Sequence, residues 1–283
     1  MTSSPAKDAW APRYDYVVVG HVTCDELADG SRRAGGSALY SGLQAARLGL
    51  RTLILTQGQS EEIQSLLEPF GEELDVATIA AEQTTTLATG GHGGRRRQRL
   101  LAWAGEIVDP PIPAGAGIVH LAPVARELGS IEKGDDFVIT PQGLLRRWRP
   151  RTGEVFLSPL SRGLLPRRFA AAVLSEHELP FCEPLLDVAR ACGACVAITA
   201  GGRPAALRLP DGSTIAGPQP PALAVRDDLG AGDVFAAAFF VALAEARDPL
   251  AAASFATAAA AIRLGGVGAQ AIGTREQIEA LTV

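Results

Sequence analysis

Short β-prone apolar runs alternate with longer stretches of helical periodicity along most of the chain. The runs that predict strands are residues 16–20, 51–56, 118–121, 137–140, 172–174 and 196–199. The stretches that predict helices are residues 37–48, 61–70, 181–192 and 250–264, and a continuous apolar segment lies at 234–244. Strands that alternate with helices are typical of βαβ units. The pattern therefore predicts an α/β fold built on a largely parallel sheet.

Two polar, β-prone segments, residues 21–34 and 84–104, do not fit this alternation. They predict a small β lid appended to the main body. No repeat, low-complexity block or long linker divides the sequence, so residues 1–283 are expected to form one domain that carries the lid. Gly35 and Gly36 follow the first segment, at the point where the lid would return to the body.

Composition excludes several classes of protein. The chain has 283 residues, of which 47% are hydrophobic and 20% charged, enough for one large core. A net charge of -5 lacks the basic footprint of nucleic-acid binding. The run 234–244 is too short to span a bilayer, and residues 1–12 lack the apolar core of a secretory signal, so a cytoplasmic location without membrane contact is expected. The four scattered cysteines are expected to be reduced.

The strongest candidate for chemistry is the run Asp-Asp-Leu-Gly-Ala-Gly-Asp at residues 227–233, directly before the apolar segment. Its small residues would let backbone N–H groups close on an anion, and a helix that starts at Asp233 would add its positive end. Asp233 could then take a proton from an attacking alcohol. The alternative is that Asp233 only caps the helix and the glycines only form a turn.

The residues Gly230, Ala231, Gly232 and Asp233, together with the early glycine pair, resemble the ribokinase-like (PfkB) family of sugar and nucleoside kinases over nearly the whole chain. The resemblance implies a three-layer α/β/α fold with a mostly parallel central sheet. It also implies that Gly230, Ala231 and Gly232 form the anion hole for the transferred phosphoryl group. Asp233 would be the base that deprotonates the substrate hydroxyl.

On the acceptor side, the resemblance assigns substrate contacts to Asp25, Gly35, Gly36 and Tyr40. A carboxylate at Asp25 is suited to accept hydrogen bonds from neighbouring hydroxyl groups. Tyr40 stands where ribokinases often have Asn, which argues against ribose itself. The alternatives are a solvated loop charge for Asp25 and an ordinary loop for the glycines.

On the donor side, the run Ser-Glu-His-Glu at 175–178 resembles the family's Asn-x-x-Glu element, with Ser175 in place of Asn, and assigns Glu178 to Mg²⁺. The run Thr-Ala-Gly-Gly at 199–202 resembles a Thr-x-Gly turn close to the nucleotide. The residues expected to bind the cofactor are Thr199, Gly201, Gly202, Asp227 and Thr257. Thr257 replaces a frequent Asn, which weakens the match to an adenine pocket.

Asp228 also departs from the family, since many relatives carry Thr or another uncharged residue there. Its charge could repel ATP, face solvent or join the water shell of a metal ion, and the sequence leaves these readings open.

The middle of the chain is loosely similar to the lid of plant-type myo-inositol kinases, in residues 84–86, 94–100 and 108–112. This similarity makes a cyclic polyol the favoured substrate. The basic residues in this part of the chain are interpreted as solvated edges of the lid or of exposed strands and loops. They are Arg95, Arg96, Arg97, Arg99, Arg146, Arg147, Arg149 and Arg151.

Together these features predict a kinase that uses ATP and Mg²⁺ to phosphorylate a small polyol or sugar. The alternatives are a nucleoside kinase and a non-catalytic metabolite-binding protein on the same fold. A homodimer through the lid edge is a further expectation, and the need for a monovalent cation stays open.

Overall fold

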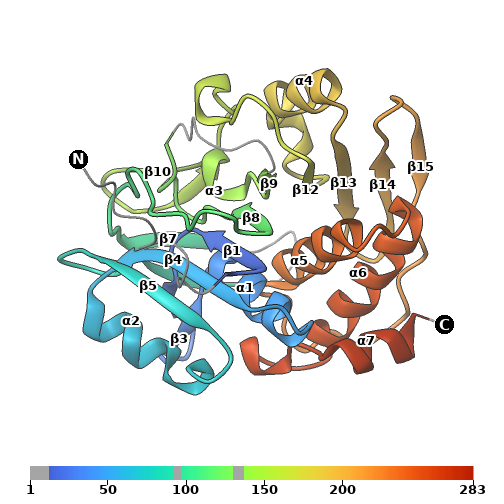
Figure 1. Cartoon of the computed structure of the whole chain (residues 1–283). Helices are drawn as coiled ribbons and strands as arrows, with labels where there is room; N and C mark the ends of the chain where they lie inside the picture. Colours follow the sequence, from blue (N-terminus) through green and yellow to red (C-terminus); the bar gives the residue numbers. More distant parts are fainter. Residues whose placement is uncertain (1–12, 92–96, 130–136, 283) are drawn as a thin grey trace, which may run out of the picture.

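The computed structural model describes residues 13–91, 97–129 and 137–282. A nine-stranded sheet forms the centre, in the order β15-β14-β13-β12-β9-β8-β1-β4-β5 (Figure 1). Its strands are β1 (Tyr16–Val19), β4 (Thr52–Gly58), β5 (Asp75–Ala80), β8 (Ile118–Leu121), β9 (Phe137–Ile139), β12 (Ala171–Ser175), β13 (Cys195–Ala200), β14 (Arg203–Arg208) and β15 (Thr214–Ala216). The pairs from β5 to β13 are parallel, and β14 and β15 are antiparallel additions. The predicted α/β fold is confirmed.

All six predicted strands are present, whereas β5, β14 and β15 were not predicted. These three strands lie at or near the two edges of the sheet. Strand β5 is half-exposed, and β14 and β15 carry arginine and threonine among small residues. Edge strands therefore lack the continuous apolar run that identified the buried parallel strands.

Helices cover both faces of the sheet. They are α1 (Ser37–Arg47), α2 (Ser60–Leu67), α3 (Gln142–Leu145), α4 (Glu183–Cys192), α5 (Ala231–Ala244), α6 (Pro249–Leu264) and α7 (Arg275–Leu281), with short 3₁₀ turns at Glu68–Phe70, Arg162–Leu164, Leu179–Phe181 and Ala269–Ala271. One core cluster joins α1, α5 and α6 to one side of β1, and the other joins α4 to its opposite side. The predicted helix at 61–70 splits at Pro69 into α2 and a 3₁₀ turn, and the helix predicted at 181–192 begins at Glu183, after the 3₁₀ turn Leu179–Phe181.

A second, four-stranded sheet forms the predicted lid. Its order is β3-β2-β6-β7, and its strands are β2 (Thr23–Glu26), β3 (Arg32–Gly35), β6 (Thr86–Gly90) and β7 (Arg97–Ala102). The chain itself covers part of the β7 edge, because the Leu100 N–H donates to the Gly153 carbonyl (2.8 Å). Gly153 lies in the turn of a hairpin formed by β10 (Arg146–Trp148) and β11 (Val155–Leu157). The expected lid contact with a second subunit stays a prediction.

The structure also bears on the cysteines, on membrane-spanning helices and on the arginine run of the lid. All four cysteines are free thiols, as expected. Within the described parts of the chain, no helix has the length and apolar character needed to cross a bilayer. Arg95 and Arg96 lie outside the described residues.

A fully buried histidine lies on β8, in the middle of the main sheet. The Nδ1 atom of His120 is hydrogen-bonded to the Tyr16 hydroxyl (2.8 Å), and Nε2 is hydrogen-bonded to the Thr140 hydroxyl (3.1 Å). Burial lowers the pKa of His120 from 6.5 to about 3. The folded protein therefore holds this ring neutral at pH values where the unfolded chain would protonate it.

This histidine makes stability depend on pH. Between pH 6.5 and 3 the unfolded chain binds a proton at His120 that the folded protein does not, so stability falls as pH falls. We expect the free energy of unfolding to decrease by about 1.4 kcal/mol per pH unit from this group. Urea unfolding from pH 7 to pH 4.5 should show a shallower decline for His120→Gln than for the wild type. If the free energies of unfolding of the variant and the wild type declined in parallel as pH falls, His120 would not be the source of this pH dependence.

Candidate active site

The run at residues 227–233 forms a loop followed by the first turn of α5. We call residues 227–230 the anion loop. The helix start predicted at Asp233 is wrong by two residues. Helix α5 begins at Ala231, because Gly230 takes a left-handed conformation (φ 76°) as its N-cap and its carbonyl accepts from the Val234 N–H (2.9 Å). The first N–H groups of a helix have no partner within it, so those of Ala231 and Gly232 are oriented toward an anion at this end of the helix.

Gly230 is required by space as well as by backbone conformation. A Cβ atom at this position would lie 2.2 Å from the ring of Tyr40 on α1. The buried tyrosine ring therefore packs directly on the backbone at the start of α5. This contact fixes the distance between the two helices at the site.

A small acceptor cavity of about 40 Å³ lies on the lid side of this turn. Its lining residues are Thr23, Asp25, Gly36, Ser37, Tyr40, Leu87, Gln98, Val124, Gln142, Arg146, Leu229, Gly230 and Asp233. It brings together Asp25, Gly36, Tyr40 and Asp233, which lie up to 208 positions apart in the sequence. We call it the acceptor cavity.

The carboxylate of Asp25, which was predicted to contact the substrate, is held in place by its neighbours on the lid. Asp25 lies on β2 and is 3% exposed, and its Oδ1 atom accepts a hydrogen bond from the Thr23 hydroxyl (2.8 Å). Gly35 does not line the cavity but lies behind Asp25, where a Cβ atom would be 2.2 Å from Oδ2. Gly35 therefore provides the space that the carboxylate occupies.

A much larger cavity, of about 740 Å³, lies on the other side of the same turn. We call it the donor cavity. It is lined by the predicted cofactor residues Thr199, Gly201, Gly202 and Thr257, together with Ala231 and Gly232. Asp228 also lines it. Apolar side chains complete the wall, among them Leu223, Val225, Phe235 and Leu264.

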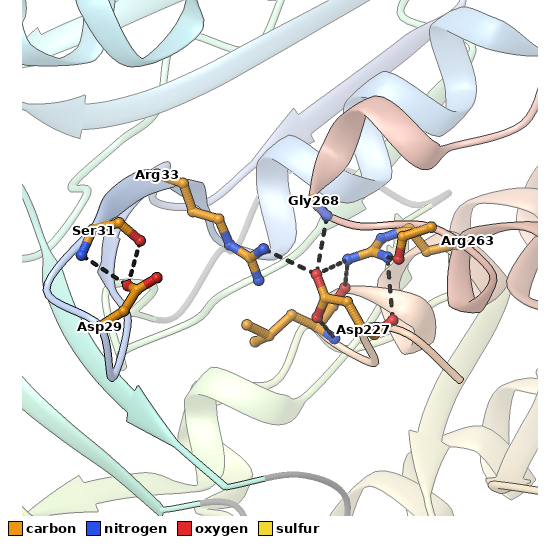
Figure 2. A network of polar contacts seen from close by, with 8 residues as sticks. Asp29, Ser31, Arg33, Asp227, Arg263 and Gly268 are labelled. Atoms are coloured by element: carbon orange, nitrogen blue, oxygen red, sulfur yellow. Dashed lines mark hydrogen bonds and ion pairs between the residues drawn. The ribbon is translucent and has the colours of Figure 1, made fainter. Parts of the chain in front are cut away.

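Asp227 lies neither in the donor cavity nor in the acceptor cavity, although it was predicted to bind the cofactor. Its Oδ2 atom contacts Nη1 of Arg33 (3.0 Å) and Nη2 of Arg263 (2.9 Å), as Figure 2 shows. Burial opposes its ionisation, but hydrogen bonds from the N–H groups of Gly268 and Leu229 and the charge of Arg263 lower its pKa well below the usual range. The Asp227 carboxylate is thus a fixed anion that lies outside both cavities.

Glu178 is buried after the carboxyl end of β12, outside both cavities. Its Oε2 atom accepts from the Ser175 N–H (2.7 Å) and the Ser175 hydroxyl (2.9 Å). Ser175, which replaces the family's Asn, therefore orients this carboxylate. Within the described ranges no three His, Cys, Asp or Glu side chains cluster to hold a metal ion. The role of Glu178 in placing Mg²⁺ stays a prediction.

Several site residues were missed from the sequence. Arg146 was interpreted as an exposed edge, yet it lines the acceptor cavity and its Nη1 atom donates to the Val124 carbonyl (2.8 Å). Ser37, Gln98 and Gln142 line the same cavity and carry no motif. Arg263 did have a signal, because it is a single charge in the alanine-rich sequence of α6.

Comparisons with known proteins agree with this architecture. Residues 169–276 match the model of the pfkB family carbohydrate kinases. A pyrophosphate-dependent kinase of the ribokinase family, solved with a pyrophosphate analog and myo-inositol, is 19% identical with a TM-score of 0.76 over 94% of this chain and 99% of that one. Arabidopsis thaliana ribokinase, solved with ribose and ATP, is 21% identical with a TM-score of 0.75 over 96% and 99%.

A third similar structure is the nucleoside kinase of Methanocaldococcus jannaschii, 17% identical with a TM-score of 0.74 over 95% of this chain and 98% of that one. No curated protein matches the sequence significantly. Together, these similar structures show that the fold is ribokinase-like. The C-terminal part of the chain, residues 169–276, is therefore similar to the pfkB family of carbohydrate kinases.

Gly230→Ala tests the geometry at the start of α5. The new methyl group would meet the Tyr40 ring, and alanine disfavours the left-handed conformation, so we expect kinase turnover to fall by about a hundredfold as the N–H groups are displaced. Gly163→Ala is the matched control, because its Cβ would meet only the Ser161 hydroxyl at 3.9 Å. Equal turnover of the two variants would contradict this account.

Proposed function

We propose that this chain transfers the γ-phosphoryl group of ATP to a hydroxyl of a small polyol or sugar, with a cyclic polyol such as myo-inositol favoured. The observation that carries the proposal is that the acceptor cavity and the donor cavity meet at the first turn of α5. Gly230 and Asp233 line one cavity, and Ala231 and Gly232 line the other. A phosphoryl group held by the N–H groups of this turn would lie between donor and acceptor.

In the proposed step, the acceptor oxygen attacks the γ-phosphorus, the bond to the β-phosphate oxygen breaks, and the hydroxyl proton passes to Asp233. Asp233 is suited to this role because it lines the acceptor cavity one residue after the anion-binding glycine. The backbone N–H groups stabilise the charge on the transferring oxygens. Mg²⁺ would accompany the donor phosphates and neutralise their charge. Ser175, the last residue of β12, orients the Glu178 carboxylate that would help to place this ion.

Two features support a hydroxyl-rich acceptor. The Ser37 hydroxyl lines the acceptor cavity, is buried, and has no hydrogen-bond partner among the described residues. Asp25 presents a carboxylate to the same space, and Gln98 and Gln142 add amide groups. The cavity is only about 40 Å³, so entry of any sugar or polyol would require the lid sheet to move outward, and a nucleoside would require a larger movement than a compact polyol.

The donor cavity supports ATP over pyrophosphate. Pyrophosphate has no apolar part, whereas the donor cavity extends over about 740 Å³ with walls formed by Leu223, Phe235 and Leu264. An apolar wall of this kind is suited to a purine base. One similar structure is described as a pyrophosphate-dependent kinase, so the donor needs a direct test.

Asp233→Asn should reduce kcat by about 10² to 10⁴-fold, because the amide cannot accept the proton. ADP release would be measured over inositols, pentoses, hexoses and nucleosides, with ATP binding measured by calorimetry. We expect the variant to keep its fold and donor affinity. Unchanged turnover would remove Asp233 from the role of base, and transfer to nucleosides alone would redirect the proposal to a nucleoside kinase.

The donor is tested by supplying ATP or pyrophosphate with the same acceptor. We expect transfer from ATP, and we expect Phe235→Asp to raise the KM for ATP because it places a charge in the apolar wall of the donor cavity. Phe156→Asp, at an exposed ring on β11, is the matched control. Transfer from pyrophosphate that is unaffected by Phe235→Asp would show that the wall does not hold a base.

A further inference from the structure

Four oxygen atoms surround the guanidinium of Arg263, which is 0% exposed. Its Nη1 atom donates to the carbonyls of Asp227 and Gly266 (both 3.2 Å). Its Nη2 atom donates to the Leu229 carbonyl (2.6 Å) and the Asp227 carboxylate (2.9 Å). Three carbonyls and a carboxylate form the kind of oxygen cage that binds cations in proteins. Figure 2 shows the guanidinium inside this cage.

The cage includes the carbonyls of Asp227 and Leu229, which belong to the anion loop, so Arg263 fixes the direction of their peptide units. In a trans peptide the N–H points away from the C=O. Because the carbonyls of Asp227 and Leu229 point toward Arg263, the N–H groups of Asp228 and Gly230 point away from it. Asp228 lines the donor cavity and Gly230 lines the acceptor cavity. Arg263 thus sets the orientation of two peptide units at the site.

The charge of Arg263 also acts on these peptide units. A cation hydrogen-bonded to a carbonyl polarises the peptide and strengthens its N–H as a donor. Arg263 and Arg33 are two cations that share the single carboxylate of Asp227, so this network carries a net positive charge behind the loop. That charge opposes the negative charge of Asp228 and favours an anion in front of the loop.

We propose that Arg263 is the built-in cation of the anion loop, a positioning residue that holds and polarises the Asp227–Asp228 and Leu229–Gly230 peptide units directly before the turn that would bind the transferred phosphoryl group. The inference rests on the proposed kinase function. Since the guanidinium is covalently attached and permanently charged, the loop needs no exchangeable monovalent cation. The proposal therefore predicts that activity does not depend on a monovalent cation at this loop.

The wild-type enzyme gives the first test. Its kcat with ATP, Mg²⁺ and its acceptor would be measured in the chloride salts of potassium, sodium and choline. We expect values within about twofold of one another at matched ionic strength. A loss in choline that potassium restores would overturn the proposal, because it would show that an exchangeable ion completes the site.

The second test replaces the cation. Arg263→Met keeps an unbranched apolar stem but removes the charge, and we expect kcat to fall by roughly a hundredfold, the effect of losing one such donor. Guanidinium chloride at concentrations far below those that unfold proteins, or potassium chloride, should restore part of the activity. Arg263→Lys, which keeps a charge, should retain more activity than Arg263→Met.

Arg275→Met is the matched control. Arg275 also donates to a backbone carbonyl, that of Leu48 (2.9 Å), and pairs with Glu245, but it lies on α7 outside both cavities. We expect its kcat to stay at the wild-type level. Guanidinium should lower the stability of both variants but raise the activity of Arg263→Met alone, which a purely structural role for Arg263 would not produce.

A binding measurement separates this inference from the proposed function. Calorimetry of ATP without an acceptor should show weaker binding to Arg263→Met and partial recovery with guanidinium. A wild-type protein that binds ATP but phosphorylates no acceptor would count against the proposed function only. A folded Arg263→Met with wild-type kcat, or one that loses activity and donor affinity without recovery by any cation, would overturn the role of Arg263.

Discussion

The arrangement of the site depends on one constraint: the peptide units before α5 must turn their carbonyls inward and their N–H groups toward the two cavities. Such an arrangement leaves carbonyl oxygens in the protein interior, where each needs a donor. Arg263 supplies that donor to the carbonyls of Asp227 and Leu229 before α5, and it also donates to the Gly266 carbonyl after α6. Asp227 balances the charge, and Gly268 and Arg33 complete its hydrogen bonds. The buried arginine therefore follows from the need to satisfy the loop.

The packing of Tyr40 on Gly230 is the second part of this arrangement. The arginine holds the loop from behind, with its Cζ atom 5.3 Å from the centre of the Tyr40 ring. The same ring limits how closely α1 and α5 approach, because only a glycine fits beneath it. Helix α5 lines both cavities and α1 lines only the acceptor cavity, so a shift of α5 would change both cavities.

Much of this architecture was predictable from local patterns. The buried parallel strands and the long helices have periodicities that indicate them, and the glycines at 230 and 232 mark the loop by composition. The start of α5 was placed two residues late because Gly230 caps the helix and the two small residues after it are already helical. Asp227 was assigned to the cofactor because spacing cannot show that two arginines, 194 and 36 positions away, reach its carboxylate. Arg146 was missed for the same reason, since only the fold brings β10 to the lid.

The ion pair between Arg33 and Asp227 has a consequence for how the two halves of the molecule communicate. Arg33 belongs to the lid strand β3, and Asp227 belongs to the anion loop. In the proposed reaction, an acceptor that displaces the lid and a donor that binds at the loop would both act on the carboxylate of Asp227. By thermodynamic linkage, a ligand that orders this ion pair would make binding of the other ligand more favourable by the same free energy. In the proposed reaction, this ion pair would make the lid strand β3 respond to donor binding as well as cover the acceptor.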